Sequence, residues 1–277
     1  MTPLVRLGGF AALLAALFAG AWAVGGAADV QRSEPDPAEG GSHGMDGMAP
    51  DRVRGLAVSD GGLTLQTAQR TAPAGRRFEL AFRIAGADGA TVRDFDVEHT
   101  KRMHLIVVRR DLTGFQHLHP AQRADGTWAV PVSLPEAGTY RVFADFSVGG
   151  KARTLATDLD VDGTVGAQAL PAPASGADVD GLRVRLADRP AAAGADSELE
   201  FRVTRDGRPV AIDDYLGAKG HLVALRQGDL AFLHVHPDAD RLRFEAMFPT
   251  SGRYRLFLQF RAEGRLHTVA FTREVAR

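Results

Sequence analysis

The stretch Met103–Pro120, MHLIVVRRDLTGFQHLHP, decides how this chain folds. Two apolar runs, Leu105–Arg109 and Phe115–His119, flank a polar RDLTG segment that has the composition of a turn. Apolar runs separated in this way are typical of two antiparallel strands joined as a hairpin. We therefore predict a β-hairpin here, with its turn centred near Asp111 and Leu112.

The same pattern returns in Gly220–Pro237, GHLVALRQGDLAFLHVHP, at an offset of 117 residues (220 minus 103). The similarity extends beyond the hairpin. LAFRI at 80–84 is repeated as LEFRV at 199–203, and PEAGTYRVF at 135–143 is repeated as PTSGRYRLF at 249–257. An internal repeat of about 100 residues indicates two copies of one folding unit.

Short segments with alternating apolar and polar side chains fill both copies, as in residues 78–84 and 140–146. Alternation with period two predicts strands, and several short strands in about 100 residues are typical of an immunoglobulin-sized sandwich. We predict an all-β chain of two tandem immunoglobulin-like β-sandwiches after an N-terminal hydrophobic helix. The PxxGxY pattern is similar to the tyrosine corner of such sandwiches, so Tyr140 and Tyr254 should bond nearby backbone.

The N-terminus predicts an export signal or a membrane anchor. Residues 7–28 hold no charged side chain, Arg6 precedes them, and acidic residues follow them. This charge order predicts that the remaining chain lies outside the cytoplasm. We expect an extracytoplasmic protein, secreted or anchored to the cell membrane, whose membrane contact is made through residues 7–28 alone.

Composition divides the chain into five segments, because stretches rich in Gly, Pro, Ala and Ser separate the parts with alternating patterns. We predict a signal peptide or membrane anchor (1–28), a disordered tether (29–54), a first β-sandwich (55–162), a linker (163–178) and a second β-sandwich (179–277).

Composition also excludes several kinds of site. The chain of 277 residues has no Cys, which excludes disulfides, thiolate zinc fingers, iron–sulfur clusters and blue-copper centres. Its 33 basic and 34 acidic side chains give a net charge of −1, which argues against a nucleic-acid partner. Nine His and five Met remain as soft or borderline metal ligands.

Three histidines of the first hairpin are predicted to converge. His117 and His119 point to one face because side chains alternate along a strand. With the turn near Asp111, His104 lies opposite His119 and Ile106 lies opposite His117, which places all three imidazoles on that face. Three imidazoles are a ligand set for Zn²⁺ or copper. The repeat predicts a second set, made of His221, His234 and His236, with His221 opposite His236.

The predicted tether adds a third group of ligands, in the segment HGMDGM at 43–48. Imidazole and thioether ligands suit copper, and Cu(I) especially, better than zinc, so His43, Met45 and Met48 favour copper over zinc. We therefore predict a protein that binds or buffers a transition metal, copper first and zinc second. Its partners would be the metal ion and another extracytoplasmic metal-handling protein.

Other interpretations fit the same residues. The predicted histidine face also carries Ile106 and Val108, which have the character of a core. The chain would then be a non-catalytic structural or protein-interaction module at the cell surface, with buried histidine networks. A metal-dependent enzyme is a third hypothesis, but no catalytic motif or general base is evident, so no catalysis is predicted. We expect His99 and His267 at the surface, and Arg109 and Arg226 as solvated ends of the hairpins.

Three stretches, Met103–Leu112, Phe115–Pro120 and Gly217–Pro237, resemble exported bacterial proteins with YtkA-like and FixH-like β-sandwich domains. Many of these are uncharacterised secreted or heavy-metal-associated proteins of actinobacteria. The resemblance covers residues 60–160 and 180–275. It implies an immunoglobulin- or cupredoxin-like sandwich outside the cytoplasm and a link to copper handling. The cupredoxin comparison concerns shape alone, since the chain has no Cys.

Overall fold

The computed structural model describes residues 14–18, 53–187, 189–233 and 235–277, except for the side chain of His236. Residues 14–18, in the compact unit Met1–Gly47, are helical. Within the described ranges, no helix has the length and apolar character needed to cross a membrane. Most of the hydrophobic helix predicted over 7–28 lies outside the described residues, as does nearly all of the tether.

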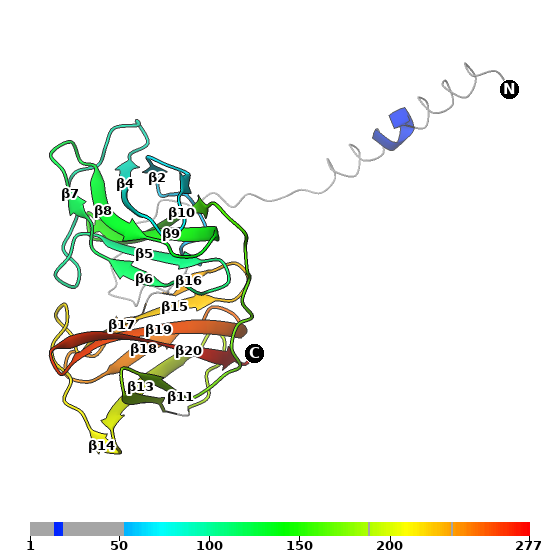
Figure 1. Ribbon diagram of the computed structural model, residues 1–277. Helices are drawn as coiled ribbons and strands as arrows, with labels where there is room; N and C mark the ends of the chain where they lie inside the picture. The colour runs from blue at the N-terminus through cyan, green and yellow to red at the C-terminus, as the bar shows by residue number, and fades with distance from the viewer. Residues whose placement is uncertain (1–13, 19–52, 188, 234) are drawn as a thin grey trace, which may run out of the picture. The chain divides into compact units, whose positions relative to one another are not determined.

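The unit Met48–Arg277 holds the described strands, which form two tandem β-sandwiches (Figure 1). The predicted fold class is therefore confirmed. The outer sheet of the first sandwich contains, in spatial order, β1 (Ser59–Asp60), β2 (Leu63–Thr67), β4 (Arg77–Ala85), β8 (Trp128–Ser133) and β7 (Ala121–Gln122). Its second sheet, here called the β5 sheet, contains β3 (Thr71–Ala72), β10 (Lys151–Val161), β9 (Gly138–Val148), β5 (His104–Arg109) and β6 (Gln116–Leu118).

The second sandwich is built in the same way. One sheet, here called the β15 sheet, contains β16 (Phe232–Leu233), β15 (Gly220–Arg226), β19 (Gly252–Ala262) and β20 (Arg265–Val275). The other, here called the β13 sheet, contains β11 (Gly176–Val179), β12 (Leu182–Leu186), β13 (Asp196–Arg205), β18 (Arg243–Met247) and β17 (His236–Pro237), while β14 (Arg208–Pro209) pairs with β13.

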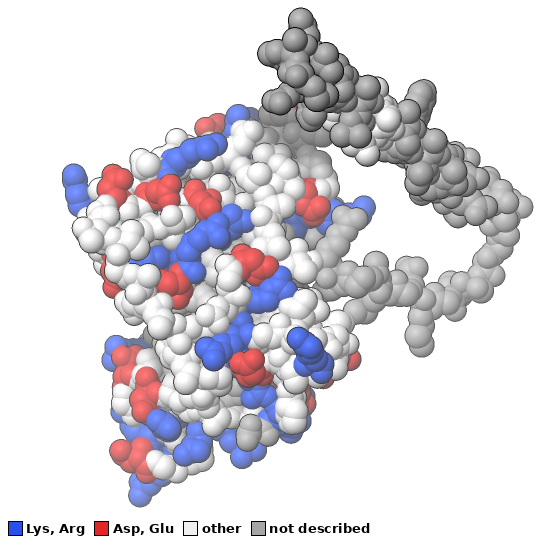
Figure 2. Space-filling view, turned by 90° about the vertical axis from the view of Figure 1, so that its right-hand side faces the viewer, with Lys and Arg blue, Asp and Glu red and all other residues white. Residues whose placement is uncertain are grey.

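In the outer sheet of the first sandwich and in the β13 sheet, buried and exposed side chains follow the alternation of the sequence. In β12, Leu182, Val184 and Leu186 are buried in the core of the second sandwich, while the intervening Arg183 and Arg185 are exposed. This one-sided burial is typical of an antiparallel sheet with one face in water. On the face shown in Figure 2, acidic and basic side chains are interspersed, in keeping with the near-zero net charge.

Strand β5 differs because both of its faces are buried. Leu105 and Val107 enter the core of the first sandwich, whereas Ile106 packs in a separate apolar cluster with Val223 and Phe257 of the β15 sheet. The Phe115 and Phe257 rings stack, with centroids 4.1 Å apart. The continuous apolar runs of β5 and β15 reflect this double burial. The face of β5 that carries Ile106 is therefore a core, and it lies between the two sandwiches.

Both predicted tyrosine corners are present. The Tyr140 hydroxyl donates to the Glu136 carbonyl oxygen at 3.0 Å, and that of Tyr254 donates to the Thr250 carbonyl oxygen at 2.9 Å. Each bond ties a long strand to the loop that precedes it.

Replacing one of these tyrosines should destabilise the protein modestly. We expect Tyr140→Phe to lower the free energy of unfolding by about 1 kcal/mol, because it removes one hydrogen bond and little packing. Urea denaturation measures this change. An unaltered urea midpoint would show that the corner contributes no stability.

Two arginines and one histidine depart from the sequence prediction. Arg109 was expected to be solvated, but it is 3% exposed and bonds Asp111, Glu136 and the Gly166 carbonyl oxygen. The linker causes this burial, because it returns across the hairpin turn. Arg226 is partly buried and pairs with Asp229.

His267 was also expected at the surface and is 2% exposed. Its Nδ1 lies 2.7 Å from the Asp180 carboxylate, and its Nε2 donates to the Ala262 carbonyl oxygen at 3.2 Å. In β20 it lies on the same inward-facing side of the strand as Val269 and Phe271, which are also buried. The expectation was wrong because alternation along the strand places His267 on the buried side.

Candidate metal centre

The first hairpin has the predicted register. Ile106 pairs with His117 and Leu105 pairs with Leu118, so His104 lies at the level of His119. The three imidazoles share the face of the β5 sheet that is turned toward the second sandwich. One ligand nitrogen from each of His104, His117 and His119 lies within 4.8 Å of the others. The predicted convergence of these three residues is present in the structure.

The spacing of the three rings suits a metal ion. The ring centroids are 5.3 Å apart for His104 and His117, 5.1 Å for His104 and His119, and 4.8 Å for His117 and His119. Around a tetrahedral ion with metal–nitrogen bonds of about 2.0–2.1 Å, imidazole centroids would be about 5.2 Å apart. The three ring centroids are thus already spaced much as they would be around one ion.

Hydrogen bonds from outside the cluster set the proton positions on two rings. His104 Nε2 donates to the Glu98 carbonyl oxygen at 3.2 Å, because a carbonyl can only accept. His117 Nδ1 donates to Gln259 Oε1 at 2.8 Å, and the Gln259 amide nitrogen donates to Thr268 Oγ1 at 3.0 Å. These bonds leave His104 Nδ1 and His117 Nε2 without a proton in the neutral rings.

Those two nitrogens face each other at 3.0 Å. Two imidazole lone pairs repel at this distance unless a proton or a metal ion lies between them. Two nitrogens bound to one tetrahedral ion would be about 3.3 Å apart, which is close to the observed separation. Because it accepts a hydrogen bond from His117 Nδ1, Gln259 resembles the outer partners that orient metal-ligating histidines.

The site favours the neutral form of His117 and His119, which is the form that binds metals. Burial, followed by the positive charges of His104, His119 and His221, holds the pKa of His117 well below its usual range. Burial, followed by His104 and Lys101, lowers the pKa of His119 to about 4. His119 Nε2 is also buried without a hydrogen-bond partner among the described residues, which is rare for a buried polar atom.

Acidic side chains contribute little to the cluster. Glu98 approaches His104 through its backbone oxygen, and the Asp96 carboxylate accepts from Ser147 and from the Gly150 backbone. Asp145 pairs with His104 across β5 and β9, and its carboxylate accepts from Thr154 Oγ1 at 2.6 Å. The cluster is thus an imidazole site.

The second hairpin departs from the repeat. Its β15–β16 pairing ends at Leu233, and His236 pairs with Glu245 of β18 in the opposite sheet. The predicted pairing of His221 with His236 is therefore not formed. His234 and the side chain of His236 lie outside the described residues, as do His43, Met45 and Met48.

A polar network explains why the chain leaves the β15 sheet after Leu233 and joins the β13 sheet at His236. Asp238 accepts from the backbone N–H groups of Asp240 and Arg241 at 2.9 and 3.2 Å, and from Arg243 Nε at 3.0 Å. At the equivalent position the first repeat has Ala121, which cannot make these bonds. The carboxylate of Asp238 therefore fixes the turn that follows β17.

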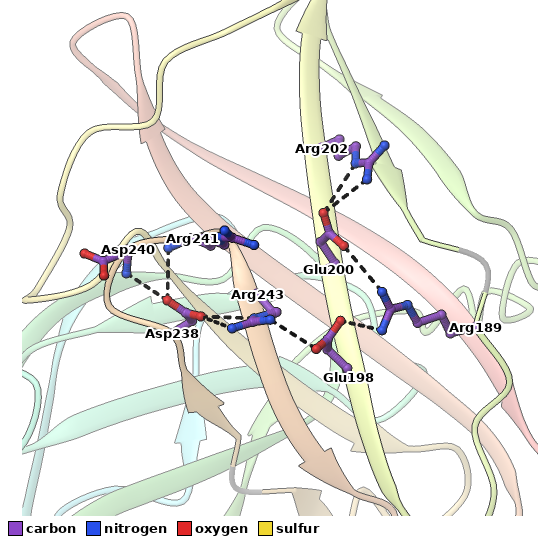
Figure 3. Close-up of polar contacts among 8 residues, drawn as sticks. All are labelled: Arg189, Glu198, Glu200, Arg202, Asp238, Asp240, Arg241 and Arg243. Carbon is purple, nitrogen blue, oxygen red and sulfur yellow. Dashed lines mark hydrogen bonds and ion pairs between the residues drawn. The ribbon is translucent and has the colours of Figure 1, made fainter.

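Figure 3 shows how this turn is tied to β13. Arg243 of β18 continues the network to Glu198 at 3.2 Å, and Glu198 pairs with Arg189 at 2.6 Å. Arg189 and Arg202 both approach Glu200, at 3.9 and 3.4 Å. These partly exposed pairs fix the path of the chain more than they stabilise it.

His221 joins the first cluster instead. Its ring centroid lies 6.1 Å from that of His104 and 5.9 Å from that of His117. His99, which is half-buried, lies with its ring 5.2 Å from His221 and 6.2 Å from His104. Burial, followed by the charges of His99, His104 and His119, lowers the pKa of His221 to about 3.

A small cavity of about 50 Å³ lies among these rings. Side chains of both sandwiches line it, among them His104 and His117 from the first and His221, Val223 and Phe232 from the second. A cavity of this size admits an ion or a few waters.

The fold and this site define a tandem β-sandwich protein with a buried imidazole cluster at the junction of its sandwiches. The chain belongs to the family described as Domain of unknown function (DUF8832), which it matches over residues 57–163 and 177–277. The resemblance to YtkA-like and FixH-like domains is supported only as far as the sandwich fold. The search of curated proteins gave no match.

Several solved structures are similar to parts of this chain at low identity. The Lin-41 filamin domain is 16% identical, with 36% of this chain and 92% of that chain covered and a TM-score of 0.26. The adhesin FdeC of Escherichia coli is 14% identical, with 80% and 66% covered and a TM-score of 0.28. Salmonella alpha-2-macroglobulin is 14% identical, with 83% and 16% covered and a TM-score of 0.29. These likenesses concern the fold alone.

Proposed function

We propose that this protein binds one transition metal ion, copper first and zinc second, through His104, His117 and His119. The observation that carries this proposal is the convergence of these three imidazoles, in which His104 Nδ1 and His117 Nε2 face each other at 3.0 Å. Each ring has its other nitrogen bonded outside the cluster, so a metal ion between the two facing nitrogens would satisfy both.

The chemistry of the ligands selects the class of ion. Imidazole nitrogens suit zinc and copper, whereas calcium and magnesium require oxygen ligands. At a given nitrogen site, divalent copper binds more tightly than divalent zinc. Copper therefore comes first where both are present at equal concentration.

The site supports holding an ion rather than turning over a substrate. The cavity of about 50 Å³ beside His104, His117 and His221 leaves little room for a substrate in addition to an ion. The nearby carboxylate of Asp145 is engaged by Thr154, so it is not placed as a general base. The proposed role is to bind, buffer or pass on the metal without catalysis.

The proposed location is outside the cytoplasm, because of the uncharged run at 7–28 after Arg6. We propose that the tether residues His43, Met45 and Met48 pass Cu(I), with no change of oxidation state, between the cluster and another extracytoplasmic metal-handling protein.

Metal retention tests the proposal. The full chain is loaded with Cu²⁺ or Zn²⁺, dialysed and assayed for metal per chain. We expect about one ion per wild-type chain and less than about 0.1 for His117→Ala, because the remaining imidazoles hold the ion too weakly. Gln116→Ala, on the opposite face of the same strand, is the matched control and should retain its ion.

Circular dichroism must show the same fold in all three proteins. If the folded wild-type chain retains no ion, the metal proposal fails and a structural or protein-interaction module with a buried histidine network replaces it.

A further inference from the structure

His221 is placed to act on the same ion, although it belongs to the other sandwich. It stands at the start of β15, is 8% exposed, and faces the rings of His104 and His117. Its Nε2 is buried and has no hydrogen-bond partner among the described residues. A buried imidazole nitrogen of this kind is an available ligand.

The His221 ring is held by its neighbours on the second sandwich. The Tyr215 ring packs edge-on against the His221 ring, with centroids 5.5 Å apart. On β19, Gln259 pairs with His221 and at the same time accepts from His117 Nδ1. The second sandwich thus already orients one ligand of the first.

We propose that His221 supplies a fourth imidazole to the ion bound by His104, His117 and His119, so that the bound ion joins the two sandwiches. This inference rests on the metal-binding function proposed above. It replaces the two separate sites expected from the repeat by one shared centre.

The His221 ring would have to move only a short distance to bind the same ion. The His221 centroid is 5.9 and 6.1 Å from those of His117 and His104, against about 5.2 Å for rings on one tetrahedral ion. A shift of less than about 1 Å would therefore bring the His221 ring to the spacing of rings on one tetrahedral ion. The cavity between the rings provides the space for that shift.

Zinc affinity of the full chain tests the shared centre. We expect His221→Ala to bind Zn²⁺ at least about 100-fold more weakly than wild type. Loss of a residue that only hydrogen-bonds a ligand lowers metal affinity by up to about 100-fold, and loss of a ligand should lower it by at least as much. Val269→Ala is the matched control, because it removes packing from the core of the second sandwich itself, away from the cavity and from the apolar cluster between the sandwiches, and supplies no nitrogen. We expect its zinc affinity to stay within about 3-fold of wild type, a change of less than 1 kcal/mol.

A ring ¹⁵N NMR spectrum gives a second readout. In the zinc-loaded wild-type chain, the His221 Nε2 signal, assigned by its loss in His221→Ala, should move to a metal-bound position. If Zn²⁺ binds the wild type but His221→Ala matches Val269→Ala in affinity and the signal does not move, the shared centre is wrong while the three-histidine site stands. If the wild type binds no Zn²⁺, both proposals fail.

Discussion

Phe257→Ala should destabilise the protein by about 3–5 kcal/mol, the usual cost of truncating a buried Phe. Phe257 is buried in the apolar cluster between the sandwiches, and its ring stacks on Phe115 at 4.1 Å. The same strand, β19, carries Gln259, which orients His117. We therefore expect this variant also to bind metal more weakly, because the second sandwich no longer positions its part of the site.

Denaturant unfolding and zinc titration measure these two effects together. The matched control is Phe271→Ala, which truncates a buried Phe in the core of the second sandwich itself. It should lose similar stability but keep more of its zinc affinity. Equal losses of zinc affinity in both variants would mean that inter-sandwich packing has no specific role in the site.

Acid should destabilise the metal-free protein steeply below pH 6.5. The pKa values of His117, His119 and His221 are lowered in the folded state, to about 4 for His119 and about 3 for His221. Between those values and 6.5 the unfolded chain binds more protons, so stability falls as the pH falls. Above pH 6.5 the three rings are neutral in both states and have no effect.

Each such histidine contributes up to about 1.4 kcal/mol per pH unit within this window. The partly exposed His119 contributes less because solvent screens it. We expect a loss of several kcal/mol between pH 6.5 and pH 5, comparable with the total stability of about 5–15 kcal/mol of a typical domain. Urea midpoints across this range measure it, and His221→Ala should show a shallower slope. A flat profile in the wild type would contradict the burial of neutral histidines.

The local features of the fold could be predicted from the sequence, because they depend on periods and turns. The hairpin register that pairs Ile106 with His117 follows from the length of the RDLTG turn and alternation along the strands. The tyrosine corners at Tyr140 and Tyr254 follow from a local motif. The convergence of His104, His117 and His119 could be predicted from the hairpin register and this alternation alone.

Features that depend on packing between distant segments could not be predicted in this way. His221 meets the first cluster because the β5 and β15 sheets pack face to face, which no local pattern specifies. Arg109 is buried because the linker returns to it through Gly166. The second hairpin ends early because Asp238 fixes a turn where the first repeat has Ala121.

The most direct test of the central claim is an anomalous-scattering measurement on crystals of the full chain grown with Zn²⁺. We predict an anomalous peak about 2.0–2.1 Å from His104 Nδ1, His117 Nε2 and a ring nitrogen of His119. The peak should vanish in His117→Ala crystals. Rings that remain bonded to one another with no peak between them, or a peak located elsewhere on the chain, would contradict the proposed metal centre.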